Sequence, residues 1–351
     1  MSPFMSSSSS KLRLYQLMAG AEHGGAELFF ERLADRFHHA EMSQALSIKP
    51  YKARIDRLSA AGITPHTCHF RPLLKPLDSY QLARQIKAFE PSVVMSWMNR
   101  ATDFTPAGSW THVARLGGYY NLKYYRECDW LVGNTRGIAD WLIQQGWPAD
   151  RVHHQVNFVP APQRPALLRA DFNTPEKEPL IVALGRLHQN KGFDTLLLAL
   201  ARTKDGILWL AGEGPERNRL EALTDELGLR DRVRFLGWQT APECVIAAAD
   251  LFVCPSRHEP FGNVIAEAFA AGKPVIATRS DGAVEHIKDG SDGVLVPLDD
   301  AAALADEIGN LIASKQTAQK LGKAAYQSWN RLFNPEKVTS DWMSFLSGVA
   351  R

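Results

Sequence analysis

The sequence predicts an α/β fold of two domains, each built around a parallel sheet. Short apolar segments of strand type alternate with amphipathic helical segments along the chain, and a parallel sheet with crossover helices requires this alternation. The chain has 351 residues, which is enough for two domains of about 150 residues that each bury a core. Five prolines fall within residues 160–179, a stretch of little periodicity, and we expect the linker between the domains there.

The first domain is expected to span residues 1–165. Its opening strand, residues 12–18, leads into a turn containing Gly20, Gly24 and Gly25 and then into an amphipathic helix over residues 26–37. The glycine spacing does not match G-x-G-x-x-G and no Walker A sequence is present, so a Rossmann dehydrogenase, an ATPase and a kinase are disfavoured. Further helices are predicted at 51–61, 80–89 and 135–145, and further strands at 92–96 and 130–133.

The second domain is expected to span residues 176–333. A helix is predicted at 263–271, and a last helix, 336–348, falls in a separate terminal segment, residues 334–351. The strands of this domain are predicted at 180–184, 207–210, 233–236, 251–254 and 274–277.

The composition is that of an ordinary globular protein, with 45% hydrophobic and 22% charged residues. A net charge of only +2 argues against a nucleic-acid partner. The four cysteines show no metal-ligand spacing and are expected to be reduced. Residues 1–10 form a serine-rich tail without the features of a secretion signal, and no apolar run is long enough to cross a membrane. We therefore expect a cytoplasmic protein.

The most informative segment of the chain runs from Cys254 to Gly272 and contains two glutamates, Glu259 and Glu267. Glu259 is expected in a loop after a buried strand, and Glu267 about one turn into the following helix, on the face that carries Asn263. The free N–H groups at the start of such a helix can bind phosphate, and the carboxylates can accept hydrogen bonds from sugar or ribose hydroxyls. An ordinary αβ unit with two surface acids would have the same pattern, so the spacing alone leaves both interpretations open.

The whole segment resembles the signature of a large family of retaining glycosyltransferases, family 4 or glycosyl transferases group 1. The resemblance continues through residues 277–297, and Gly185–Gly192 is similar to the phosphate-binding turn of the family. It implies the GT-B fold, which consists of two Rossmann-like α/β domains facing a cleft. In that fold the C-terminal helix, here residues 334–351, crosses back to the N-terminal domain.

The resemblance also implies roles for individual residues. Arg186 and Lys191 follow a strand end, where they could offset the charge of a diphosphate leaving group, and Glu259 would bind the transferred sugar. A solvated turn is the alternative for the two cations. Trp238 could stack on a nucleobase, although a half-buried core tryptophan fits the sequence as well. The remaining expected donor-binding residues are Gly24, Gly25, Phe261, Gly262, Asn263, Val264 and Glu267.

The implied reaction transfers a hexose-type sugar from a nucleoside diphosphate to a glycolipid, lipopolysaccharide or polysaccharide, with retention of configuration. We expect no cofactor and no metal, because the sequence lacks the D-x-D acids that would hold a divalent ion. Two alternatives stay open: a nucleotide-sugar epimerase of the same fold, and a non-catalytic nucleotide-sugar-binding subunit.

The acceptor side is less specified by the sequence. Many family members carry a histidine where this chain has Gly117 or Gly118, and His112 lies nearby but out of register. Arg115, Tyr119, Asn121 and Lys123 could replace its contacts, or pack as ordinary loop residues. Basic residues are frequent between 49 and 75 and are compatible with peripheral contact at the inner membrane face, although a solvated charged face has the same composition. These residues are Lys49, Lys52, Arg54, Arg57, Arg71 and Lys75, interspersed with Tyr51, Phe70 and Leu73.

Overall fold

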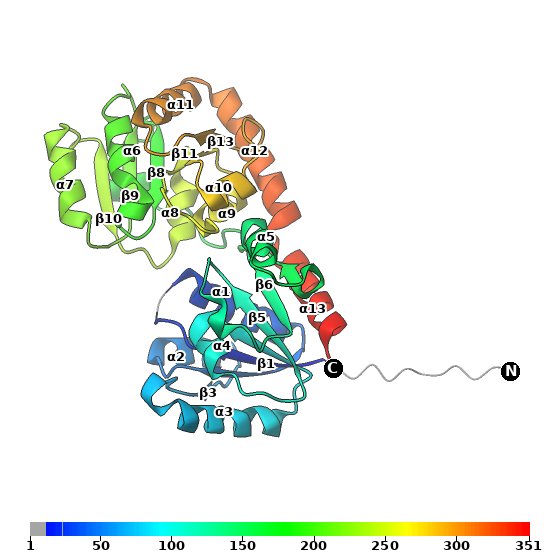
Figure 1. Cartoon of the computed structure of the whole chain (residues 1–351). Helices are drawn as coiled ribbons and strands as arrows, with labels where there is room; N and C mark the ends of the chain where they lie inside the picture. Colours follow the sequence, from blue (N-terminus) through cyan, green and yellow to red (C-terminus); the bar gives the residue numbers. More distant parts are fainter. Residues whose placement is uncertain (1–11, 23) are drawn as a thin grey trace. The chain divides into compact units, whose positions relative to one another are not determined.

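The computed structural model describes residues 12–22 and 24–351, so the serine-rich start of the chain lies outside the described residues. The chain divides into two compact units (Figure 1). The first extends to Val156 and includes Val338–Arg351, and the second comprises Asn157–Lys337. Within the described residues, no helix combines the length and the hydropathy that crossing a bilayer would require.

The described part of the first unit contains a seven-stranded sheet in the order β3-β2-β1-β4-β5-β6-β7, with all neighbouring strands parallel. All five residues of the central strand β4 are buried, as expected where helices cover both faces of a parallel sheet. The strands are β1 (Arg13–Met18), β2 (Ser43–Ile48), β3 (His66–Thr67), β4 (Val93–Trp97), β5 (Thr111–Leu116), β6 (Trp130–Gly133) and β7 (Val152–His154). The helices are α1 (Gly25–His39), α2 (Lys52–Ala60), α3 (Lys75–Phe89), α4 (Met98–Phe104), α5 (Arg136–Gln144) and α13 (Pro335–Val349).

The second unit contains a six-stranded parallel sheet in the order β10-β9-β8-β11-β12-β13. Its central strands are continuous apolar runs whose side chains are buried against the helices. The strands are β8 (Leu180–Leu184), β9 (Ile207–Ala211), β10 (Val233–Gly237), β11 (Leu251–Cys254), β12 (Val275–Thr278) and β13 (Val294–Val296). The helices are α6 (Phe193–Leu200), α7 (Arg217–Glu226), α8 (Pro242–Ala248), α9 (Asn263–Ala270), α10 (Asp281–His286), α11 (Ala301–Ala313) and α12 (Lys315–Leu332).

Each sheet reverses its strand order once. In the first unit the chain moves outward from β1 to β3 and then returns to place β4 on the other side of β1. In the second unit the same reversal lies between β8 and β11. At such a point the loops after the two central strands diverge and leave a crevice at the carboxyl edge of the sheet, which is where open α/β sheets bind ligands.

The proline-rich stretch belongs to the second unit, which corrects the expected linker at 160–179. The Leu167 amide donates to the Cys244 carbonyl over 3.0 Å, and Arg169 Nη2 donates to Asp250 Oδ2 over 3.0 Å. The indole of Trp209 donates to Thr174 Oγ1 over 2.8 Å. These contacts satisfy backbone and side-chain groups of the stretch, so the change of unit falls between Val156 and Asn157 rather than at 165.

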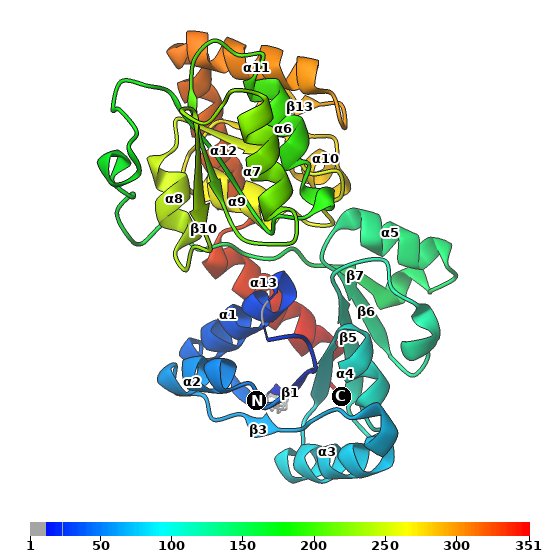
Figure 2. The same ribbon diagram turned by 90° about the vertical axis from the view of Figure 1, so that its left-hand side faces the viewer.

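The C-terminal part of α13 packs on the first unit, beside the last three strands (Figures 1 and 2). The Phe345 ring stacks on the His153 ring of β7 with a centroid distance of 4.1 Å, and it meets the Trp130 ring of β6 edge-on at 5.6 Å. The Thr111 hydroxyl at the start of β5 donates to the Val349 carbonyl over 2.6 Å. The terminal residues thereby cover part of this sheet, at β5, β6 and β7.

Two central strands of the first unit were not predicted, namely β2 and β5. Both contain polar residues that are nevertheless buried, so the apolar pattern of a strand is interrupted. In β2, Ser47 Oγ lies 2.7 Å from the Tyr15 hydroxyl. In β5, His112 Nε2 lies 2.9 Å from Ser96 Oγ, and the Arg115 guanidinium lies 5.1 Å from the Trp97 ring centroid. These partners offset the cost of burying the polar groups.

Candidate functional site

Lys191 and Glu259 form an ion pair at the carboxyl edge of the second sheet, at its point of reversal. Lys191 ends the turn that follows β8, and Glu259 lies in the loop that follows β11. Lys191 Nζ donates a short hydrogen bond to Glu259 Oε2, and the hydroxyl of Ser256 donates to the same oxygen over 3.3 Å. The side chains are 23% and 12% exposed, so both charged ends stay within reach of a ligand.

The electrostatics of the site favour the charged form of Lys191. Burial opposes the charge of Lys191, but Glu259 more than offsets this, and the pKa of Lys191 is raised. Burial raises the pKa of the neighbouring Cys254 thiol to about 11, and the charge of Glu259 adds to the shift. Cys254 is therefore a neutral thiol at the floor of the site. The lysine supplies a fixed positive charge there.

Gly192 allows the two loops to approach each other. Its φ is 61°, in the left-handed region that favours glycine. A Cβ atom at this position would lie 2.0 Å from the carbonyl oxygen of Pro255. Any larger residue would therefore push the turn after β8 away from the loop after β11, and Lys191 would move with it.

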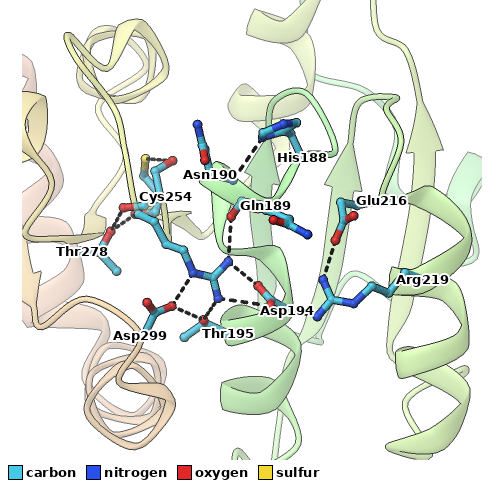
Figure 3. Close-up of polar contacts among 12 residues, drawn as sticks. His188, Gln189, Asn190, Asp194, Thr195, Glu216, Arg219, Cys254, Thr278 and Asp299 are labelled. Carbon is cyan, nitrogen blue, oxygen red and sulfur yellow. Dashed lines mark hydrogen bonds and ion pairs between the residues drawn. The ribbon is translucent and has the colours of Figure 1, made fainter.

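Arg257 connects the same two loops, a role that the sequence did not indicate. Its Nη1 donates to the Gln189 carbonyl over 2.7 Å, and its backbone amide donates to the Asn190 carbonyl over 2.8 Å. The guanidinium also binds the Asp194 carboxylate, at 2.9 and 3.1 Å, and Asp299 Oδ1, at 2.6 Å. Figure 3 labels these two acids and Gln189, which lie close together. Arg257 thus holds both Lys191 and Glu259 in place from outside the pair.

Asp194, which binds the Arg257 guanidinium, is ionised in the fold. Burial opposes the charge of Asp194, but the hydrogen bonds from Arg257 outweigh it, and the pKa of Asp194 is lowered. The same hydrogen bonds raise the pKa of Arg257. Asp194 and Asp299 lie 63 and 42 residues from Arg257, so no local spacing in the sequence marks this cluster.

The start of α9 is fixed by contacts on both sides. Gly262 precedes the helix with φ 83°, and Asn263 Oδ1 accepts a hydrogen bond from Asn157 Nδ2 over 3.1 Å. The Phe261 ring is buried and meets the His286 ring at 4.6 Å, so this residue can offer a ligand its backbone but not its ring. The Glu259 carbonyl accepts from the Gly282 amide over 2.8 Å, which ties the loop to the start of α10.

The other predicted donor-binding residues are more dispersed. Arg186 is exposed after β8, and its side chain has no partner among the described residues. Trp238 is 64% exposed after β10, so it is not the core tryptophan that the sequence also allowed. Val264 and Glu267 are half-buried in α9. Gly24 and Gly25 belong to the first unit, where they are exposed at the beginning of α1.

The first unit has its own cavity at its point of strand reversal, with a volume of about 480 Å³. Its walls come from the loops after β1 and β2, from the starts of α1 and α4, and from Trp97 and Tyr120. The sequence did not predict it because β2, whose carboxyl end carries Lys49, was not recognised as a strand. The lining residues are Ala19, Gly20, Ala21, Glu27, Lys49, Tyr51, Trp97, Met98, Asn99, Arg100 and Tyr120.

Several residues considered for the acceptor side have structural roles instead. His112 is buried within β5, and burial lowers its pKa to about 4, so it is a neutral core histidine. Arg115 is also buried, against the rings of Phe29 and Trp97. Asn121 caps the short helical turn that contains Lys123, by accepting from the Lys123 amide over 3.1 Å.

The basic stretch 49–75 does not form a free cationic face. Arg54 is buried and donates to Glu31 Oε1 over 2.9 Å, and Phe70 is buried as well. The other ion pairs join Arg57 to Glu31, Lys52 to Asp56, Arg71 to Asp78 and Lys75 to Asp103. Of the six cations considered, Lys49 is left without a carboxylate partner among the described residues.

Comparison with known proteins gives consistent results. Residues 166–328 match the profile of the family Glycosyl transferases group 1. The chain is 36% identical to the lipopolysaccharide core biosynthesis glycosyltransferase LpsD of Rhizobium meliloti over 97% of this chain and 100% of the relative. It is also 36% identical to LpsE of the same organism, over 92% and 96% of the two chains.

Solved structures with lower identity share the fold. A glycosyltransferase from Rickettsia africae superposes with a TM-score of 0.85 at 20% identity, covering 97% of this chain and 99% of that one. HepE of Anabaena, in complex with UDP, gives a TM-score of 0.84 at 22% identity, covering 96% and 100%. The predicted GT-B fold and the predicted enzyme class are confirmed. The chain belongs to the Glycosyl transferases group 1 family of glycosyltransferases.

Proposed function

We propose that this glycosyltransferase moves a hexose-type sugar from a nucleoside diphosphate to a lipopolysaccharide-type acceptor, with retention of configuration and without a metal ion. The observation that carries the proposal is the Lys191–Glu259 pair at the reversal point of the second sheet. This is the place in an α/β sheet where a nucleotide binds, and the pair offers a cation for phosphate together with a carboxylate for hydroxyls.

In the proposed reaction, Lys191 and Arg186 stabilise the negative charge that builds up on the departing diphosphate. Lys191 is held by Arg257 and Gly192 before the donor arrives, so its positioning costs little when the reaction occurs. Glu259 accepts hydrogen bonds from sugar hydroxyls. The acceptor attacks on the face from which the diphosphate leaves, and the diphosphate takes the acceptor's proton, which accounts for retention without a covalent intermediate.

The acceptor class is proposed from the relatives. LpsD and LpsE are named for lipopolysaccharide core biosynthesis, and each aligns over most of this chain. Both are named as transferases, which favours transfer over the epimerase and the non-catalytic subunit considered from the sequence. A cytoplasmic location is part of the same proposal, since nucleotide-sugar donors are intracellular metabolites.

Peripheral contact with the membrane stays a prediction. The basic stretch 49–75 supports it less than expected, because its cations other than Lys49 are paired with carboxylates. Sedimentation of the protein with vesicles that contain or lack anionic lipid tests it directly.

The proposed function is tested by incubating the purified protein with a panel of nucleotide sugars in the presence of EDTA and measuring released nucleoside diphosphate. One donor should be hydrolysed slowly, and Lys191→Met should lose this activity while keeping its melting temperature within a few degrees of wild type. Hydrolysis that requires an added divalent ion would overturn metal independence. If no donor is bound or hydrolysed, the donor-site assignment is wrong. Retention is read from the anomeric configuration of the product by NMR.

A further inference from the structure

The cavity of the first unit has two cationic side chains and one carboxylate, that of Glu27, among its lining residues. Lys49 lines it from the loop after β2, and Arg100 lines it from the first turn of α4. Neither forms an ion pair with any of the residues that the structure describes. Nearby cations outside the cavity differ in this respect, since Lys52 pairs with Asp56 and Arg57 with Glu31. Lys49 and Arg100 therefore differ from these two paired neighbours.

The cations of this region repel one another. Burial lowers the pKa of Lys49, the charges of Arg100 and Arg54 lower it further, and the charge of Glu27 opposes the shift without cancelling it. Glu27 also lines the cavity, where its Oε1 accepts a hydrogen bond from the Ala21 amide over 2.8 Å, and its single negative charge faces the two cations of the wall. An anion between Lys49 and Arg100 would relieve this repulsion, and charge-assisted hydrogen bonds to both side chains would hold it.

The rest of the wall suits a sugar. Asn99 Oδ1 accepts from the Tyr125 hydroxyl over 2.8 Å, which leaves the amide nitrogen of Asn99 to donate to a ligand. Tyr51 provides an aromatic surface beside Lys49, with 5.9 Å between Lys49 Nζ and the ring centroid. Met98, between β4 and Asn99, has φ 61°, a strained conformation for a non-glycine residue, and such strain is concentrated at functional sites.

We propose that this cavity binds an anionic saccharide, a sugar that carries a phosphate or a carboxylate, with Lys49 and Arg100 as the ligands of its charged group. The inference rests on the proposed glycosyltransferase function, and it specifies the acceptor: the sugar unit next to the site of transfer is acidic. The diphosphate of the donor is the other possible source of such an anion, so the test must separate the two.

The experiment measures binding to the full chain by ligand-observed NMR titration. One arm uses glucose 6-phosphate and glucuronate, each compared with glucose, and the other arm uses UDP, GDP and ADP. The proteins are wild type, Lys49→Gln, Arg100→Gln and the matched control Lys52→Gln, which removes an equal charge three residues further along the chain and outside the cavity. Thermal melting establishes that each variant is folded.

We expect wild type to bind at least one of the two acidic sugars more tightly than glucose. Lys49→Gln and Arg100→Gln should each weaken that binding by about tenfold, with nucleoside diphosphate affinity unchanged, and Lys52→Gln should behave as wild type. The proposal is overturned if glucose binds as well as both acidic sugars, if the two variants bind them like wild type, or if Lys52→Gln weakens binding equally.

The two arms also separate this inference from the proposed function. If Lys49→Gln and Arg100→Gln lose nucleoside diphosphate affinity as strongly as acidic-sugar affinity, the cations serve the donor and the acceptor assignment is wrong. If wild type binds acidic sugars through Lys49 and Arg100 but binds none of the three nucleotides, the donor-site proposal fails and the anionic cavity stands.

Discussion

Lys191 donates a hydrogen bond to Glu259 across 68 residues of sequence. The contact exists because β8 and β11 are neighbours in the sheet although two strands, β9 and β10, separate them along the chain. The loops that follow the two strands leave the same edge, and Gly192 and Arg257 then bring them together. The candidate donor site is therefore a product of strand order.

Replacing Lys191 should reduce catalysis strongly and stability only slightly. Lys191→Met takes away the cation proposed to stabilise the leaving group, and loss of one such preorganised group costs about 10²–10³ in kcat. The Glu259 carboxylate keeps its hydrogen bond from Ser256 and is partly exposed, so we expect a stability loss of only about 1–3 kcal/mol. Donor hydrolysis and urea unfolding measure the two effects. Lys191→Arg, which retains the charge, should keep part of the nucleotide affinity, and wild-type turnover by Lys191→Met would remove this lysine from the mechanism.

Arg257 should act as a positioning residue. Arg257→Met removes the contacts to Gln189, Asp194 and Asp299 without touching either member of the Lys191–Glu259 pair. We expect kcat/KM to fall by about 10-fold to 100-fold, because a small displacement of a catalytic group is costly.

The comparison for Arg257→Met is Arg219→Gln, which also loses a contact to Asp194 but lies on α7 and is 56% exposed. It should remain close to wild type. Arg257→Lys should recover part of the activity. If Arg219→Gln is as impaired as Arg257→Met, the effect belongs to Asp194 and not to the connection between the loops.

A pair of glycine substitutions should isolate the contact between the loops from backbone strain. Gly192 and Gly228 have similar φ values, 61° and 67°, but a Cβ on Gly228 would meet nothing within 4 Å. Gly228→Ala should therefore lower the free energy of unfolding by about 1–2 kcal/mol, because alanine disfavours the left-handed conformation. Donor hydrolysis by this variant should be normal. Gly192→Ala should lower the free energy of unfolding by more than Gly228→Ala does, and it should also reduce donor hydrolysis. Chemical unfolding and activity assays on both variants test this, and equal costs would show that the close approach to Pro255 is unimportant.

His112 should make the stability of the protein depend on pH. Burial lowers its pKa from 6.5 to about 4, so between these values the unfolded chain takes up a proton that the folded chain does not. The free energy of unfolding should thus decrease as the pH falls from about 6.5 to about 4, by roughly 2–3 kcal/mol. His112→Gln should show a shallower dependence in this window, measured by urea unfolding at several pH values. Parallel curves for the two proteins would contradict the prediction.

Much of the second unit could be predicted from its sequence. Its strands are short apolar runs, and the predicted bounds of β8 and β11 agree with the structure. Such strands are buried on both faces, so their sequences are continuous apolar runs that can be recognised without knowing their neighbours. The signature after β11 also located Glu259 and the start of α9 correctly, because its residues are contiguous in the chain.

The sequence by itself determined the α/β class, the family and the candidate donor residues, since each of these depends on local patterns. The tertiary structure decided what depends on distant partners. It buried His112 and Arg115 in β5, a strand that was not predicted because these polar residues interrupt its apolar pattern. It also assigned the proline-rich stretch to the second unit. It also placed Arg257 between the two donor loops and left Lys49 and Arg100 unpaired on one cavity wall. A sequence shows which side chains are charged. Whether each charge has an ion-pair partner depends on which helices, strands and loops the fold places next to one another.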